Sequence, residues 1–182
     1  MQLSIKREWF CTEQHKEDIG TKKDLVLYRL QIAKADLKSA RILLAAEEYR
    51  GANNRAYYAI FHTINAIHGM SGKAYKRHKD AIGNFNRDYV KTEIFPREMG
   101  RKIGEAEVIR HASDYDDFYI ASREESERQI AVADEFIQLA EKYCIAQLDD
   151  EFCLKLYEQY QNDPEKDESF TMEECKKEWG LT

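Results

Sequence analysis

Apolar side chains recur at alternating steps of four and three residues near the start of this 182-residue chain. They are Val26, Leu30, Ala33, Leu37, Ala40 and Leu44. This spacing places them on one face of a long helix over residues 24–46, with the charged residues between them on the opposite face. No proline occurs from residue 21 to 95, and the whole chain holds only 2 Pro and 8 Gly, too few turn residues for a β-rich fold. The pattern predicts an all-α protein.

Four later segments also have helical character. The first of them is apolar nearly all round, which is typical of a central helix, and either Asn53 or Asn54 can cap its start. The predicted helices cover residues 53–69, 76–90, 98–111 and 122–146. Helices of this length joined by short loops pack side by side, so the expected fold is an antiparallel bundle of about five helices.

Charge is distributed unevenly along the chain. From residue 149 to the end there are eleven acidic and four basic side chains, whereas residues 73–110 hold ten Lys or Arg against six Asp or Glu. We predict an N-terminal extension (1–20), the helical bundle (21–148) and an acidic C-terminal tail with short helices (149–182). The tail is expected either to fold back over a cleft of its own chain or of a second copy, where it moderates access to Arg55 and His62, or to serve only as a solubilising segment.

The cysteines give no sign of a metal site or a disulfide framework. Cys11, Cys144, Cys153 and Cys175 form no CxxC pair, and no histidine lies at zinc-finger spacing from them. We expect reduced thiols, no metal and no cofactor. The N-terminus lacks the apolar run of a signal peptide and no segment is long enough to span a bilayer, so we expect a cytoplasmic protein without membrane association.

Three stretches carry a family resemblance. They are "NRAYYAIFHTINAI", "KRHKDAIGNFNRDYV" and "GRKIGEAEVIRHASDYDD", in this order. With them the chain resembles, over about residues 24–146, the HEPN domain family (higher eukaryotes and prokaryotes nucleotide-binding), in particular its small stand-alone prokaryotic branch. The resemblance implies a helical bundle that forms a homodimer. It also implies a partner, a minimal nucleotidyltransferase that is often encoded next door and acts as the antitoxin.

The resemblance also implies candidate catalytic residues. Many members of the wider family are metal-independent ribonucleases, in which four to six residues separate an Arg from a His and the pair lies in a cleft at the dimer interface. Arg55 and His62, with six residues between them, meet this rule. An imidazole that titrates near neutrality suits proton transfer, and a guanidinium suits a phosphate. Positions seven apart share a helix face but lie roughly 10 Å apart along its axis.

Six further residues are candidates for contact with RNA or a nucleotide: Tyr58, Lys76, Arg77, His78, Arg110 and Asp114. The basic cluster at residues 76–79 forms either a phosphate-backbone contact or a solvated helix face. Tyr58 is either a stacking platform or a core aromatic. Arg110, His111 and Asp114 are close enough in sequence to face the same cleft and are second-tier candidates.

A structural interpretation of the same residues stays open. In it, Arg55 is a buried cation paired with Asp114, His62 is a core histidine, and loss of Arg55 costs roughly 3 kcal/mol of stability. Ala56 follows Arg55, where active members of the family usually have a polar residue.

Two functions are therefore expected. The first is a toxin-type HEPN component that cleaves or binds RNA or nucleotides without a metal. The alternative is a non-catalytic accessory or antitoxin-like module that binds a nucleotidyltransferase or another protein. The net charge of -6 slightly favours the alternative, because RNA-cutting domains usually carry a stronger positive field.

Overall fold

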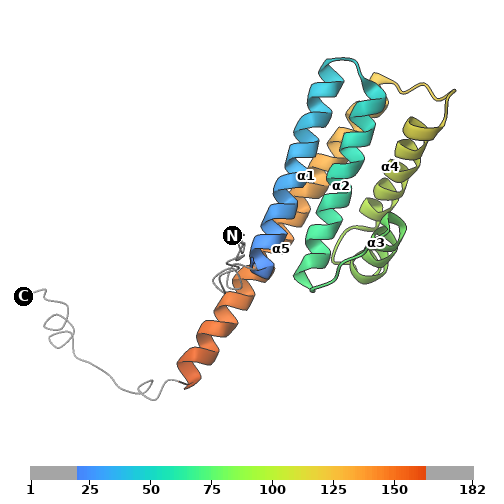
Figure 1. Ribbon diagram of the computed structural model, residues 1–182. Helices are drawn as coiled ribbons and strands as arrows, with labels where there is room; N and C mark the ends of the chain where they lie inside the picture. The colour runs from blue at the N-terminus through green and yellow to red at the C-terminus, as the bar shows by residue number, and fades with distance from the viewer. Residues whose placement is uncertain (1–19, 163–182) are drawn as a thin grey trace, which may run out of the picture. The chain divides into compact units, whose positions relative to one another are not determined.

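The computed structural model describes residues 20–162, in which every regular element is helical. The elements are α1 (Lys22–Ala45), α2 (Tyr49–Met70), α3 (His78–Phe85), the π-helical turn η2 (Asn86–Val90), α4 (Arg97–Tyr115) and α5 (Arg123–Asn162) (Figure 1). These five α-helices confirm the predicted all-α bundle. None of the helices in this part of the chain is long and apolar enough to cross a bilayer. The chain divides into two compact units, the first ending at Cys144 and the second beginning at Ile145.

Helix α1 begins at a capping box. The backbone N–H of Thr21 donates to the Asp24 carboxylate (2.8 Å), and the Thr21 hydroxyl oxygen accepts from the backbone N–H of Asp24 (3.2 Å). This reciprocal pair satisfies donors that the first turn of a helix leaves open. The buried side chains of α1 are Val26, Leu30, Ala33, Leu37 and Ala40, as their spacing predicted. Leu44, the last member of the predicted stripe, is half-buried.

Helix α2 is the central element, because it packs against α1, α3 and α4. The sequence predicted a start at Asn53 or Asn54, and this was wrong, since α2 begins at Tyr49. Asn53 lies inside the helix and is 1% exposed. The reversal of the chain after α1 is made instead at Glu47, whose φ of 62° places it in the left-handed region.

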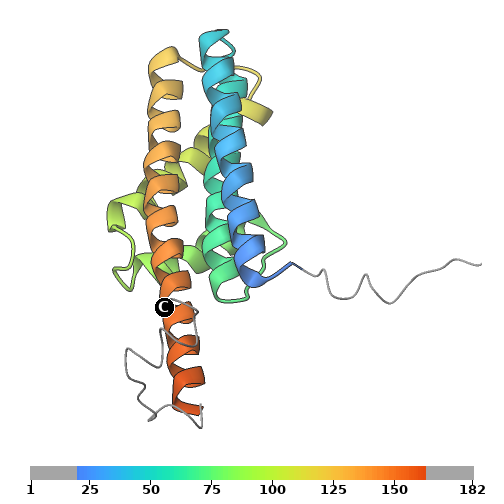
Figure 2. The same ribbon diagram turned by 90° about the vertical axis from the view of Figure 1, so that its left-hand side faces the viewer.

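The first part of α5, up to Cys144, closes the bundle. Its Phe136 packs edge-on against Phe85 of α3, with ring centroids 5.3 Å apart, and against Phe95 at 5.9 Å. Ion pairs tie the same stretch to its neighbours: Arg41 of α1 to Asp134 at 3.0 Å, and Lys102 of α4 to Glu135 at 2.9 Å. This part of α5 therefore runs beside α1, as Figure 2 shows, and also contacts α4.

The sequence predicted a break after residue 146 and a separate short helix beyond Asp149. This was wrong, because α5 continues without interruption to Asn162. Residues 147–162 contain neither Gly nor Pro and are rich in good helix formers such as Leu, Glu, Gln and Lys, so nothing in the local sequence ends the helix.

Some sequence predictions fall outside residues 20–162. They include the N-terminal extension and the end of the acidic tail with its short helices. Cys11 and Cys175 lie outside as well, whereas Cys144 (buried) and Cys153 (exposed) are free thiols. The predicted boundaries at residues 20 and 148 stay predictions.

Candidate functional site

One carboxylate joins the two predicted catalytic residues. The Arg55 guanidinium donates from Nη1 to Oδ1 of Asp36 at 3.0 Å, and Nε2 of His62 lies 3.6 Å from Oδ2 of the same group. Asp36 belongs to α1, whereas Arg55 and His62 lie on one face of α2. The side chain of Asp36 is 14% exposed, and those of Arg55 and His62 are 40% and 30% exposed. The site is therefore a half-buried patch that solvent can reach.

Asp36 is the member of the site that the sequence did not identify. It lies among Lys34, Lys38 and Arg41 on the face of α1 that the sequence predicts to be solvated. The sequence does show that Asp36 is a lone acid among basic residues, on a helix next to the helix that carries the Arg–His motif. That signal becomes informative only once the α1–α2 hairpin sets the register between the two helices.

The predicted ion pair between Arg55 and Asp114 was wrong. Arg55 turns to Asp36 on α1, and its Nη2 donates to Oδ1 of Asn54 at 3.2 Å. Asp114 is held by its own helix neighbour Arg110, whose Nη2 lies 2.9 Å from its carboxylate, and by Nδ2 of Asn54 at 2.6 Å. Side chains four positions apart on one helix are neighbours, so Asp114 pairs with Arg110 of its own helix and not with Arg55 of α2.

The ring of Tyr58 is the centre of the cluster. The Arg55 guanidinium carbon lies 4.7 Å from the centroid of this ring, and that of Arg110 lies 6.0 Å from it. The His78 ring stands edge-on to it at 5.8 Å, and the His62 ring lies at 6.5 Å. Two cations and two imidazoles from α2, α3 and α4 thus surround one aromatic ring. The spacing suits cation–π contact with the nearer arginine.

His78 points inward, away from the basic cluster in which the sequence places it. Its Nδ1 lies 2.9 Å from the hydroxyl oxygen of Tyr57, a residue that is 2% exposed. Its ring stacks on Phe61 with centroids 3.8 Å apart. Among the residues described, Nε2 of His78 has no hydrogen-bond partner, so the ring is fixed on one side and available on the other.

Arg110 is a fixed cation on the α4 side of the site. Its side chain is 14% exposed, and its guanidinium carbon lies 5.5 to 6.0 Å from the ring centroids of Tyr57, Tyr58 and Tyr115. Its Nε is buried and has no partner within residues 20–162. A buried donor without a partner is uncommon in folded proteins.

Burial controls the titration of both imidazoles. It lowers the pKa of His62; the nearby Asp36 carboxylate opposes this effect and Arg55 adds to it. Burial also lowers the pKa of His78, and Arg110 adds to the lowering. Both rings are therefore mainly neutral at pH 7 and able to accept a proton.

Lys76 and Arg77 do not join this cluster. Both are exposed in the segment before α3, where Arg77 is the N-cap residue. No hydrogen bond or ion pair connects either side chain to another residue of the described chain. Of the eight predicted site residues, the structure brings together Arg55, Tyr58, His62, His78, Arg110 and Asp114.

A small hollow adjoins the cluster. It has a volume of about 340 Å³ and lies between the end of α1, the start of α2 and the end of α4. Arg55 and Asp114 border it, together with Arg50 and the buried Ser113. Arg50 is held there by hydrogen bonds from Nε to the Ser113 carbonyl (2.7 Å) and from Nη2 to the Asp116 carbonyl (2.8 Å). A ligand at Arg55 has room to extend in this direction.

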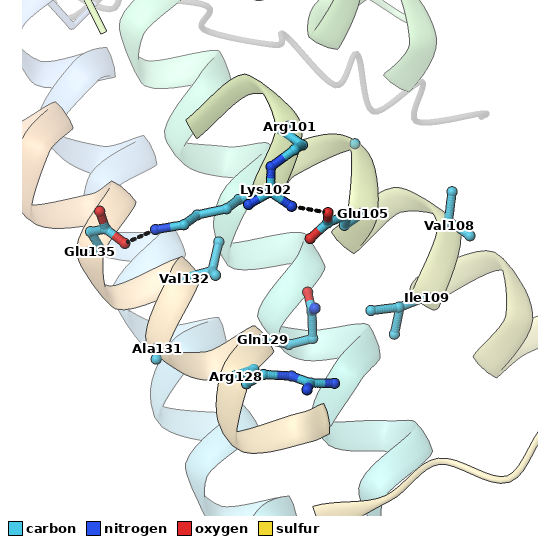
Figure 3. A pocket seen from close by; sticks show the side chains of 11 residues that line it. Arg101, Lys102, Glu105, Val108, Ile109, Arg128, Gln129, Ala131, Val132 and Glu135 are labelled. Atoms are coloured by element: carbon cyan, nitrogen blue, oxygen red, sulfur yellow. Dashed lines mark hydrogen bonds and ion pairs between the residues drawn. The ribbon is translucent and has the colours of Figure 1, made fainter. Parts of the chain in front are cut away.

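A larger hollow of about 760 Å³ lies between α4 and α5 (Figure 3). Its apolar wall includes Val108, Ile109 and Val132, and the ion pair between Lys102 and Glu135 lies at one end. None of the eight predicted site residues lines it, and it holds no histidine or cysteine. It is a separate feature from the cluster around Tyr58.

Comparison with known proteins identifies the family. The sequence profile of the HEPN domain matches residues 26–143. The chain is 29% identical over 124 residues to "UPF0332 protein" of Thermotoga maritima, covering 68% of this chain and 94% of that protein. It is 32% identical over 113 residues to "Putative toxin MJ0605" of Methanocaldococcus jannaschii (62% of this chain, 84% of that protein) and 26% identical over 117 residues to "Putative toxin MJ0142" of the same organism (64% and 80%). The chain belongs to the HEPN domain family.

Proposed function

We propose that this HEPN protein is a metal-independent endoribonuclease and the toxin component of a toxin–antitoxin pair. The observation that carries the proposal is the position of the Asp36 carboxylate, which faces both Arg55 and His62. This one carboxylate links the two residues of the family's Arg–His motif. Two relatives that carry the name "Putative toxin" support the biological role.

The proposed reaction begins with deprotonation of a ribose 2′-hydroxyl. His62 takes this proton, and the resulting imidazolium faces the Asp36 carboxylate, which stabilises it. The 2′-oxygen attacks the adjacent phosphorus, and the Arg55 guanidinium stabilises the added negative charge. The bond between phosphorus and the 5′-oxygen breaks, and the leaving 5′-oxygen takes up a proton. The products are a 2′,3′-cyclic phosphate and a 5′-hydroxyl, so no metal-bound water is required.

The neighbouring residues suit a single-stranded substrate. Tyr58 is half-buried in the middle of the cluster and offers an aromatic face on which a base can stack. Lys76 and Arg77 are exposed and contribute phosphate-backbone contacts outside the site, which raise affinity without reading sequence. Arg110, neutralised in part by Asp114, holds a second phosphate or the same one from the α4 side.

The proposed assembly is a homodimer that binds RNA and is silenced by a minimal nucleotidyltransferase. Light scattering at micromolar concentration is expected to give about twice the chain mass of 21.4 kDa. Co-expression with a nucleotidyltransferase encoded next to this gene is expected to restore growth to cells that the protein alone inhibits. A particle of single-chain mass, or no growth effect, contradicts this part of the proposal.

The experiment that tests the activity uses purified protein, single-stranded RNA and an excess of EDTA. Wild-type protein is expected to cleave the RNA, and the His62→Ala variant is expected to lose the activity while keeping its melting temperature. His111→Ala is the matched control, because His111 is an exposed histidine of α4 whose ring, within residues 20–162, contacts only that of Tyr115. Cleavage by the His62 variant at the wild-type rate rejects the assignment.

A non-catalytic interaction module is the second candidate. It is favoured by the ion pairs Arg55–Asp36 and Arg110–Asp114, which neutralise both cations of the cluster in the absence of a ligand. On this account Arg55→Ala weakens binding of the nucleotidyltransferase while no preparation of the wild-type protein cleaves RNA. The EDTA assay therefore separates the two functions.

A further inference from the structure

We propose that His78 is the general acid of the same site and protonates the 5′-oxygen as it leaves, while His62 accepts the proton of the 2′-hydroxyl. This inference rests on the proposed ribonuclease function. It assigns to catalysis a residue that lies outside the family's Arg–His motif.

The chemistry requires two proton transfers. The 2′-oxygen loses a proton as it bonds to phosphorus, and the 5′-oxygen gains one as its bond to phosphorus breaks. One imidazole, starting neutral, can accept the first proton but cannot at the same moment donate the second. With His62 as the base, the site needs a separate donor on the far side of the phosphate.

The structure places a second imidazole at a suitable distance. The ring centroids of His62 and His78 lie 5.9 and 3.8 Å from the centroid of the Phe61 ring, so the two imidazoles are at most about 10 Å apart. In this reaction the attacking and the leaving oxygen lie on opposite sides of the phosphorus atom. If the base hydrogen-bonds one oxygen and the acid the other, each over about 3 Å, the acid and the base are also separated by about 10 Å. Both rings flank Tyr58, and the two arginines lie next to the same ring.

The contacts of His78 fix the nitrogen that it offers. Its Nδ1 is directed at the hydroxyl of the buried Tyr57, and stacking on Phe61 sets the plane of the ring. When the ring is protonated, Nδ1–H donates to the Tyr57 oxygen and Nε2–H remains for the substrate. A ligand-facing imidazole whose other nitrogen is held by a buried partner is the arrangement that proton-transfer residues require.

The charged and titratable groups around His78 come from two helices. His62, Tyr57 and Tyr58 face it from α2, and Glu107, Arg110 and His111 act on it from α4. Burial and the Arg110 charge disfavour the imidazolium, so only a minor fraction of His78 is protonated at pH 7. That fraction acts as the acid, and the same two effects make it a strong proton donor. The alternative is that His78 only packs the start of α3 against α2, and the test must separate these roles.

The test compares two RNA substrates that differ in the leaving atom. In one, the bridging 5′-oxygen of the cleaved linkage is replaced by sulfur, which departs without being protonated. His78→Gln keeps an amide that can hydrogen-bond Tyr57, and it is expected to cleave ordinary RNA about 100-fold more slowly than wild type. On the sulfur-containing RNA the same variant is expected to stay within about threefold of wild type, whereas His62→Gln is slow on both substrates.

A second variant covers the case in which His78→Gln does not fold. Tyr57→Phe removes only the hydroxyl that positions His78, so its rate on ordinary RNA is expected to fall and its rate on the sulfur-containing RNA to stay near that of wild type. Equal slowing of either variant on both substrates, or full activity of His78→Gln on ordinary RNA, overturns the inference. If His78→Gln is fully active and His62→Gln is inactive, the proposed ribonuclease function stands and only the role of His78 is rejected. If the wild-type protein cleaves neither substrate, both the proposed function and this inference are rejected.

Discussion

Replacing Asp36 with Asn is the sharpest perturbation of the site. The change removes the charge that faces Arg55 at 3.0 Å and His62 at 3.6 Å and keeps the shape of the side chain. Without the carboxylate, the imidazolium that forms at His62 during the reaction is left with the positive charges of Arg55 and Arg29, both of which disfavour it. Because removing the Asp behind a catalytic histidine costs about 10⁴-fold in a Ser-His-Asp triad, the longer contact here is expected to cost about 100-fold.

The expected loss of stability is small. The Arg55 side chain is 40% exposed, so its pair with Asp36 is worth about 1 kcal/mol, far less than a fully buried ion pair. A change of this size lowers the melting temperature by about 3 °C in a chain of this length. The activity loss is thus much larger than unfolding can explain at the assay temperature.

The assay is the pH dependence of RNA cleavage. Asp36 raises the pKa of His62 against the opposing effect of burial, so its removal lowers that pKa further. The acidic limb of the rate profile, where the base becomes protonated, is expected to move to lower pH in Asp36→Asn. Asp134→Asn is the control, because Asp134 also pairs with an arginine across two helices, at 3.0 Å, but lies outside the cluster. Unchanged cleavage and an unchanged acidic limb in Asp36→Asn would refute the reasoning.

Three further predictions concern stability. Arg55→Ala is expected to lower the free energy of unfolding by about 1 kcal/mol, measured by urea titration, and a loss of 3 kcal/mol or more means that the pair is buried in solution. Phe136→Ala is expected to cost about 4 kcal/mol by the same titration, because the ring is fully buried against Phe85 and Phe95; a loss under 1 kcal/mol contradicts this packing. Burial holds the pKa of His68 below its ordinary value of 6.5, so the unfolded chain binds the proton more readily. The contribution of the neutral His68 to stability is therefore expected to be fully present above pH 6.5 and to be lost as the pH drops below it. In His68→Asn the melting temperature is expected to decline less steeply between pH 7 and 5.

The parts of the fold that the sequence predicted well are those set by local periodicity. The buried stripe of α1 follows from spacing alone, because each apolar residue lies one turn from the next. The start of α2 does not. Its first turn is held by distant contacts, namely Arg50 on the carbonyls of Ser113 and Asp116, while Asn53 offers a local capping signal that the structure does not use.

The candidate site shows the same division. Arg55 and His62 could be identified from their spacing on one helix, since both lie in one continuous segment. The partners that define their chemistry come from elsewhere: Asp36 lies 19 positions before Arg55 and reaches it through the α1–α2 hairpin. Likewise, the hydrogen bond between Tyr57 and His78 spans 21 positions, so the sequence groups His78 with its basic neighbours while the fold places it among aromatic rings.

The nature of the RNA ends tests the central claim most directly. Wild-type protein is incubated with a defined RNA in EDTA, and the fragments are analysed by mass spectrometry. The proposed reaction at Arg55 and His62 predicts 2′,3′-cyclic phosphate ends opposite 5′-hydroxyl ends, which are absent when His62→Ala replaces wild type and present with His111→Ala. Intact RNA with the wild-type protein, or fragments with 5′-phosphate ends, contradicts the account.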